Sequence, residues 1–167
     1  MKENGYDVIS VGKIYDIFAG KSLREAIPTE NNTMGMDLTM KALGSDFTGL
    51  CFTNLVDFDM VCGHRNDAAG YARALNEFDV WLGGFLDKMQ NSDLLMITAD
   101  HGCDPLTEST DHSREYTPLL CFGECISAID LGTRKSFADI GKTILDIFDI
   151  ENNLSGNSFL EQIRNNL

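Results

Sequence analysis

The chain has 167 residues, 43% hydrophobic and 23% charged, which is close to a globular average and excludes a disordered or rod-like chain. Its length fits one ordinary domain. Lys and Arg number 13 against 26 Asp and Glu, a net charge of −13. Because so acidic a surface repels a phosphate backbone, we expect no nucleic-acid partner. The negative net charge is still compatible with a small anionic substrate, since bound metal ions can reverse the sign of the electrostatic field inside a pocket.

The sequence contains no segment that we expect to enter a membrane. Its longest central aliphatic run, residues 94–97, is far shorter than the ~20 residues that span a bilayer. The first ten residues, MKENGYDVIS, have no apolar core of a signal peptide. Five cysteines without a CxxC pair then indicate reduced thiols, so we expect a cytoplasmic location.

Four short apolar runs predict strands, at residues 6–11, 49–56, 93–99 and 117–122. After the first run, residues 32–43 are predicted to form a helix capped by Asn32 or Thr33, with a glycine at its stop position. Apolar residues at three- and four-residue spacing predict a longer helix over residues 71–89. A Gly-Gly pair interrupts that pattern and predicts a bend in the helix.

The last part of the chain is predicted to be helical as well. Ser136 caps a helix, with Asp139 three residues later in an approximate capping box. A loop at residues 152–157 precedes a short terminal helix. Near-continuous apolar strands separated by helices are typical of a mostly parallel sheet with helices on both faces. Since no repeat or linker divides the chain, residues 1–167 are predicted to be a single α/β domain.

All three histidines stand beside aspartates and close to predicted strands. Asp59 and His64 come after the second strand, and Asp100 and His101 directly follow the third. His112 lies on the loop that enters the fourth strand. Ligands of open α/β sheets bind at the carboxyl ends of the strands, so we expect folding to bring these side chains together.

Imidazole and carboxylate ligands without thiolates suit Mn²⁺, Zn²⁺, Fe²⁺ or Co²⁺ better than Ca²⁺. The number of these side chains exceeds what one four-coordinate ion uses, which indicates two ions. Two metals ~3.5–4 Å apart can clamp the attacking and departing oxygens of a phosphoryl group. The residues alone therefore predict a metal-dependent hydrolase or transferase. Asp57, two residues before Asp59, is an equally suitable ligand by residue type.

Three segments resemble the metal-binding segments of the phosphopentomutase family, within the alkaline phosphatase superfamily. They are NLVDFDMVCGHRNDAAGYARALNEFD, ITADHGCDP and TDHSREYTPLL. The stretches YDVISVGKIYDIFAG and MGMDLTMKAL are similar as well, so the resemblance covers nearly the whole chain. It implies an alkaline-phosphatase-like α/β core, of which this chain would be the C-terminal portion following a cap domain.

The family interconverts ribose or deoxyribose 1-phosphate and 5-phosphate, using two Mn²⁺ ions, a phosphorylated threonine and a sugar bisphosphate activator. By motif, the resemblance implies that Asp59, His64 and His112 bind one ion. It implies that Asp100 and His101 bind the other. The family spacing favours Asp59 over its neighbouring aspartate.

Two cations near these segments are candidates for contacting phosphate. Lys13 matches a lysine near the family's active site, and a solvated lysine at a strand end is the alternative. Arg114 could meet a phosphate, pair with Glu115 or make a loop contact.

The family pattern also implies parts that this sequence lacks. Those enzymes begin with a strand ending in an aspartate ligand, then the nucleophilic threonine, then the cap domain. Four threonines near the predicted site do not stand in the nucleophile's context: Thr98, Thr107, Thr110 and Thr117. We therefore expect the chain alone to be inactive, with the missing N-terminal part of the enzyme and a pentose phosphate as its partners.

Two other interpretations stay open from the sequence. One is a related metalloenzyme of different chemistry, either a cofactor-independent phosphoglycerate mutase or a phosphatase. The other is a non-catalytic module that metal stabilises.

Overall fold

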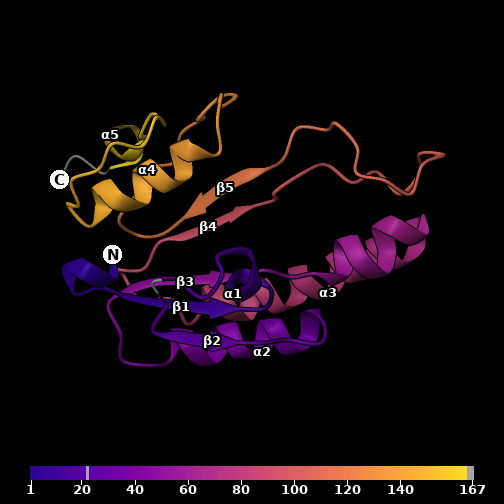
Figure 1. Cartoon of the computed structure of the whole chain (residues 1–167), viewed down its shortest axis with the longest axis horizontal. Coiled ribbons are helices and arrows are strands. Elements are labelled where there is room, and N and C mark those ends of the chain that lie inside the picture. The colour runs from indigo at the N-terminus through magenta and orange to yellow at the C-terminus, as the bar shows by residue number, and fades with distance from the viewer. Residues whose placement is uncertain (22, 165–167) are drawn as a thin grey trace.

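The computed structural model describes residues 1–21 and 23–164. It has an α/β fold, as predicted (Figure 1). The strands are β1 (Asp7–Val11), β2 (Glu25–Ile27), β3 (Gly49–Thr53), β4 (Leu95–Thr98) and β5 (Leu119–Phe122). The helices are α1 (Ile14–Ile17), α2 (Asn32–Leu43), α3 (Ala68–Leu86), α4 (Ala138–Ile147) and α5 (Leu160–Ile163). Short turns complete the described elements: 3₁₀ turns at Lys2–Asn4 and Gly63–Arg65, and a π-helix at Phe58–Cys62.

The strands form a parallel sheet and a separate antiparallel pair. The parallel sheet has the order β2-β1-β3, with Ile9 of β1 opposite Glu25 on one side and Cys51 on the other. In the second pair, Ile97 of β4 lies opposite Leu120 of β5. The prediction of a mostly parallel sheet therefore holds for β1, β2 and β3, whereas β4 and β5 depart from it as an antiparallel pair. A parallel neighbour needs a crossover, usually helical, and the chain between β4 and β5 is an irregular loop.

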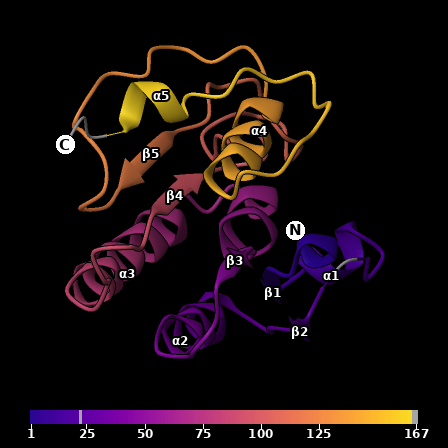
Figure 2. The same cartoon turned by 90° about the vertical axis from the view of Figure 1, so that its left-hand side faces the viewer.

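The sheet buries one face against α2. Ile9, Val11 and Ala42 form a buried cluster, because alternate residues of β1 point toward the helix. Figure 2 shows α2 and α3 on one side of the parallel sheet and α1 and α4 on the other. On that second side Tyr6, just before β1, packs on Phe148 at the end of α4, with ring centroids 4.6 Å apart. Helices thus lie on both faces, as predicted.

The sequence pattern did not predict two short elements of the sheet region, β2 and α1. β2 is three residues long and α1 four, so neither contains enough residues for a hydrophobic period to be visible. β2 is fixed by pairing with β1, where Ile27 lies opposite Val11. The long helix is confirmed, and it continues through Gly83 and Gly84 before ending at Leu86.

The caps differ from the predicted ones. Asn31, not Asn32 or Thr33, caps α2 by accepting a hydrogen bond from the Met34 amide. At α4 the predicted capping box is wrong. Asp139 turns inward and is 2% exposed, because its carboxylate binds the Arg134 guanidinium at 2.9 Å. A buried charge is retained only where it is paired, and this pairing engages the Asp139 carboxylate with Arg134 although the residue lies in the first turn of α4.

No helix within the described ranges is long and apolar enough to cross a membrane.

Candidate metal centre

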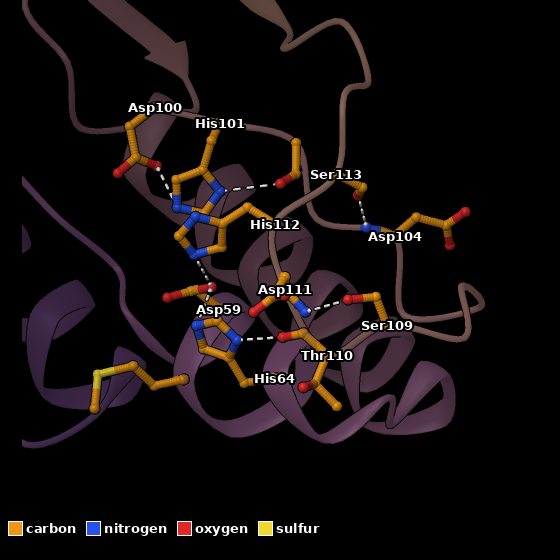
Figure 3. A network of polar contacts seen from close by, with 12 residues as sticks. Asp59, His64, Asp100, His101, Asp104, Ser109, Thr110, Asp111, His112 and Ser113 are labelled. Carbon is orange, nitrogen blue, oxygen red and sulfur yellow. Dashed lines mark hydrogen bonds and ion pairs between the residues drawn. The ribbon is translucent and has the colours of Figure 1, made fainter.

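The predicted ligands meet where strands of the fold end. The π-helix that follows β3 carries Asp59, and the 3₁₀ turn after it carries His64. Asp100 and His101 come directly after β4, and His112 lies on the loop leading into β5 (Figure 3). Gly102 forms a bridge with Ser113, which lays the two arms of the β4–β5 loop side by side. Folding therefore brings all three histidines into one cluster.

Asp59 lies at the centre of a three-residue group. Its Oδ1 atom is 3.3 Å from Nε2 of His64 and 3.3 Å from Nε2 of His112. One ligand atom from each residue lies within 4.8 Å of the others. The three side chains are between 32% and 47% exposed, so an ion could enter from solvent. Among the described residues, this is the one group of three or more His, Cys, Asp or Glu with such geometry.

The hydrogen bonding of His64 shows what this group is suited to bind. Nδ1 of His64 faces the carbonyl oxygen of Thr110, which can only accept, so Nδ1 carries the proton. In the neutral form of the ring, the lone pair is then on Nε2, which faces Asp59 Oδ1. Asp59 Oδ1 is itself buried without a hydrogen-bond partner in the described part of the chain. Two lone pairs facing each other repel unless a cation lies between them, so the donors fit a metal ion.

His101 extends the cluster toward a second pair of donors. Its Nδ1 donates to the Gly102 carbonyl at 3.0 Å, which leaves the Nε2 lone pair free and 3.7 Å from Asp100 Oδ1. The ring stacks on His112 with centroids 3.6 Å apart and planes at 17°. Asp100 is 73% exposed. The structure thus places two donors here, beside the first group but more open to solvent.

Asp57 is separated from the cluster by its own partners. Its Oδ2 accepts a hydrogen bond from the Asn32 amide at 2.7 Å, and its amide donates to Asn32 Oδ1 at 2.9 Å. The carboxylate is therefore committed to the start of α2. Of the two aspartates that residue type could not separate, only Asp59 faces the histidines.

Two cations near the cluster have no carboxylate partner in the part of the chain that the structure describes. Lys13 follows β1, is exposed and places its Nζ against the sulfur of Met60, the residue after Asp59. Arg114 is exposed and forms no ion pair within residues 1–21 and 23–164, so of its three alternatives the pairing with Glu115 is not seen.

The nearby thiols are poor candidates for metal ligands. Burial raises the pKa of Cys62, and the charges of Asp67 and Asp57 raise it further. Burial likewise raises the pKa of Cys103, with Asp59 the next cause. Thiolate is the form that binds metals, so a raised pKa keeps these groups as thiols at neutral pH.

Sequence reasoning missed the groups that orient the ligands. The Thr110 carbonyl belongs to the backbone and leaves no signal in residue type. Gly63 does leave a signal in the sequence, because it is a glycine directly before His64. A Cβ at Gly63 would lie 2.2 Å from the sulfur of Cys103, so only glycine allows the His64 turn to lie this close to the loop after His101.

Comparison with known proteins agrees with this geometry. Residues 7–152 match the model of the metalloenzyme superfamily. The chain belongs to the metalloenzyme superfamily. The superfamily match spans β1 to the end of α4 and includes every residue of the cluster.

Curated relatives within the superfamily are much longer than this chain. A phosphopentomutase of Lachnoclostridium phytofermentans is 58% identical over 163 residues, which are 97% of this chain and 42% of the relative. One of Acetivibrio thermocellus is 55% identical over 162 residues, 96% of this chain and 42% of the relative. One of Carboxydothermus hydrogenoformans is 56% identical over 163 residues, with the same 97% and 42% coverage. The chain thus spans 42% of the length of these metalloenzymes.

Proposed function

We propose that this chain is the metal-binding part of a phosphopentomutase, which interconverts ribose or deoxyribose 1-phosphate and the corresponding 5-phosphate. The observation that carries the proposal is the position of Asp59 Oδ1, 3.3 Å from Nε2 of both His64 and His112. Identities of 52–58% to phosphopentomutases along almost the whole chain support the choice of reaction over a phosphoglycerate mutase or a phosphatase.

The proposed ligands are those that the cluster brings together. Asp59, His64 and His112 would hold one Mn²⁺ ion, and Asp100 with His101 would contribute to holding a second. Bound divalent ions supply positive charge that stabilises the oxygens of a phosphoryl group during its transfer. The histidines then act as neutral ligands and not as general bases, because the protons on His64 and His101 are engaged by backbone carbonyls.

Lys13 is the proposed contact for a substrate phosphate. It lies beside Met60, and hence next to the segment that carries Asp59, with an exposed ammonium group. In a chain with a net charge of −13, a local cation is what an anionic sugar phosphate needs in order to bind.

The threonine that carries the phosphoryl group is proposed to lie outside this chain. The Thr98 hydroxyl donates to the Pro118 carbonyl at 2.8 Å, and the Thr107 hydroxyl lies 3.0 Å from the Asp104 carbonyl. Thr110 meets the cluster through its carbonyl oxygen. The hydroxyl groups of Thr98 and Thr107 therefore have structural partners, and a sugar bisphosphate would activate a threonine supplied by another part of the full-length protein.

Exposed apolar side chains support a larger enzyme around this domain. Leu120 and Phe122 of β5 are 60% and 47% exposed, and Phe52 of β3 is 41% exposed. In the fold we propose, an N-terminal core segment would cover such surface, and a cap domain would complete the substrate site. The five free cysteines suit the cytoplasm, which we propose as its compartment.

³¹P NMR tests the proposed reaction. Ribose 5-phosphate, Mn²⁺ and a sugar bisphosphate are added to the full-length gene product, to its Asp59→Asn variant and to the 167-residue chain. The expected result is ribose 1-phosphate with the full-length product alone. A silent full-length product would overturn the proposed reaction. Turnover by the 167-residue chain would instead overturn the proposal that the nucleophile lies outside it.

A phosphoglycerate substrate, added in parallel, separates the proposed reaction from its nearest alternative. Conversion of 3-phosphoglycerate without conversion of the pentose phosphate would assign the site to a phosphoglycerate mutase.

A further inference from the structure

Asn66 links the turn that carries His64 to the loop that carries His112. It follows the Gly63–Arg65 turn directly and lies in the left-handed region, with φ 52° and ψ 32°. Asparagine tolerates this conformation better than most side chains. The backbone N–H of Asn66 closes the turn by donating to the Gly63 carbonyl at 3.0 Å.

The side chain of Asn66 reaches across to the loop. Its Nδ2 donates to the Thr107 carbonyl at 2.9 Å. Its Oδ1 is buried and has no hydrogen-bond partner among the described residues. The side-chain amide of Asn66 is therefore held by the bond from Nδ2 alone. If this amide were rotated by 180°, its oxygen would face the carbonyl oxygen of Thr107, and the two oxygens would repel each other.

A second bond joins the same two segments. His64, two residues before Asn66, directs Nδ1 at the carbonyl of Thr110, three residues after Thr107. The loop is thus fixed at two carbonyls by two side chains of one turn. His112 follows Thr110 by two residues, so the position of this loop also sets the position of His112 (Figure 3).

We infer that Asn66 is a positioning residue, which holds the Thr107–Thr110 segment so that the Thr110 carbonyl keeps the proton of His64 on Nδ1. This inference rests on the proposed function, because it concerns the ligand atom that His64 presents to a metal. Loss of the Asn66 bond would release the loop, and His64 would then populate both tautomers. Groups of this kind around a metal ligand typically contribute 10- to 100-fold to metal affinity.

The test uses the full-length gene product with ¹⁵N-labelled histidine, and signals of His64 are assigned by their loss in a His64→Gln variant. Asn66→Asp keeps the shape of the side chain and the tolerance for positive φ, but it places a carboxylate against the Thr107 carbonyl. We expect the metal-free wild type to show His64 protonated on Nδ1 and the variant to show a mixture of tautomers. Mn²⁺ affinity, measured by electron paramagnetic resonance, should fall about 10-fold.

Asn66→Gly is the second variant, in case the carboxylate prevents folding. Glycine keeps the left-handed turn and removes the side-chain bond, so it should give the same mixture of tautomers. Asp149→Ala is the matched control, because Asp149 also has φ 52° but lies at the end of α4. It should strain the backbone without changing the His64 spectrum or the Mn²⁺ affinity.

The outcomes separate this inference from the proposed function. An unchanged His64 tautomer together with Mn²⁺ affinity within about twofold of wild type, in either Asn66 variant, would overturn the positioning role. The same loss of affinity in Asp149→Ala would also overturn it, since the effect would then be one of general strain. Absence of Mn²⁺ binding in the wild type would instead remove the proposed function, whatever the tautomer of His64.

Discussion

Asp57 and Asn32 exchange two hydrogen bonds, one from each backbone amide to the other residue's side chain, at 2.7 Å and 2.9 Å. Two positions further along, Asp59 instead faces two imidazole nitrogens and has a buried oxygen without a hydrogen-bond partner among the described residues. The carboxylates of Asp57 and Asp59, separated by one residue, thus have different roles. One secures the start of α2, and the other belongs to the candidate metal centre.

Substituting these aspartates should separate metal affinity from stability. Asp59→Asn should lower Mn²⁺ affinity by ~100-fold or more. Loss of a group that only hydrogen-bonds to a metal ligand can lower the affinity by ~100-fold, and this substitution removes a ligand itself. The metal-free protein should be as stable as wild type or slightly more so, because the amide can donate to the His64 lone pair. Titration with Mn²⁺ and thermal unfolding in a chelator measure the two effects.

The neighbouring aspartate provides the control. Asp57→Ala leaves the Asn32 amide without its acceptor and should cost about 1–2 kcal/mol of unfolding free energy with Mn²⁺ affinity unchanged. Equal losses of affinity in both variants would contradict the separate roles of the two aspartates.

Gly63 should be sensitive to the smallest side chain. In Gly63→Ala the new Cβ would lie 2.2 Å from Cys103 Sγ and 3.1 Å from the Phe58 carbonyl. The loop after β4 must then move away from the His64 turn, at a cost of about 1–3 kcal/mol. Urea unfolding measures the cost, and Mn²⁺ titration should show weaker binding as the histidines separate.

A double-mutant cycle identifies Cys103 as the cause. Removing its sulfur in Cys103→Ala leaves the Phe58 carbonyl at 3.1 Å and the Cys103 Cβ at 3.7 Å from the new methyl group. The cost of Gly63→Ala should therefore fall by about 1 kcal/mol or more in the Cys103→Ala background, as expected for residues in contact. Additive costs would show that the two side chains are not coupled.

Residue type and spacing could predict which segments meet, but not how each side chain is engaged. His64, His101 and His112 were identifiable because each stands near an aspartate and an apolar strand, and ligands of α/β folds bind at the ends of strands. The choice between Asp57 and Asp59 depended on Asn32, which is remote in sequence. The predicted strand beginning at residue 49 extended to 56, whereas β3 ends at Thr53.

In the fold, the shortest elements and the helix ends were likewise the parts that residue type and spacing could not predict. Long periodic helices such as α2 and α3 are visible in sequence, since many residues contribute to the pattern. β2 exists only through its pairing with β1, a contact that a local pattern does not contain. Asp139 satisfies the local rule for a capping box, yet burial beside Arg134 determines its place.

That buried pair should be essential to the C-terminal part of the domain. Asp139 is 3% and Arg134 19% exposed at the side chain, and Asp139 Oδ1 also accepts from the Asn157 amide at 2.8 Å. Asp139→Ala leaves a partly buried guanidinium without its partner, which typically costs about 3–5 kcal/mol. Urea unfolding should show this loss.

An exposed pair in the neighbouring helix serves as the control. Glu161 is 83% and Arg164 57% exposed at the side chain, so Glu161→Ala should cost about 0.5 kcal/mol or less. A similar cost for both variants would show that burial does not determine the contribution of these ion pairs.

Partly buried thiols should make the protein lose stability in alkali. Burial raises the pKa of Cys51 and of Cys121 above the ordinary thiol value of 9.0. The folded state therefore keeps these protons to higher pH than the unfolded state does. Above pH 9.0 the unfolded state binds fewer protons, so the free energy of unfolding falls as the pH rises. Below that pH both states are protonated, and the thiols contribute no slope.

Cys51→Val isolates this effect at one position. The valine cannot ionise, so the decline in unfolding free energy between pH 9.0 and pH 11 should be shallower than in wild type. Val8→Ala, one residue before Ile9 in the adjacent strand, should lower stability by the same amount at every pH, because it changes packing alone. Chemical denaturation across that range, in a chelator, measures both curves. Parallel curves for wild type and Cys51→Val would show that the Cys51 thiol ionises equally in the folded and unfolded states.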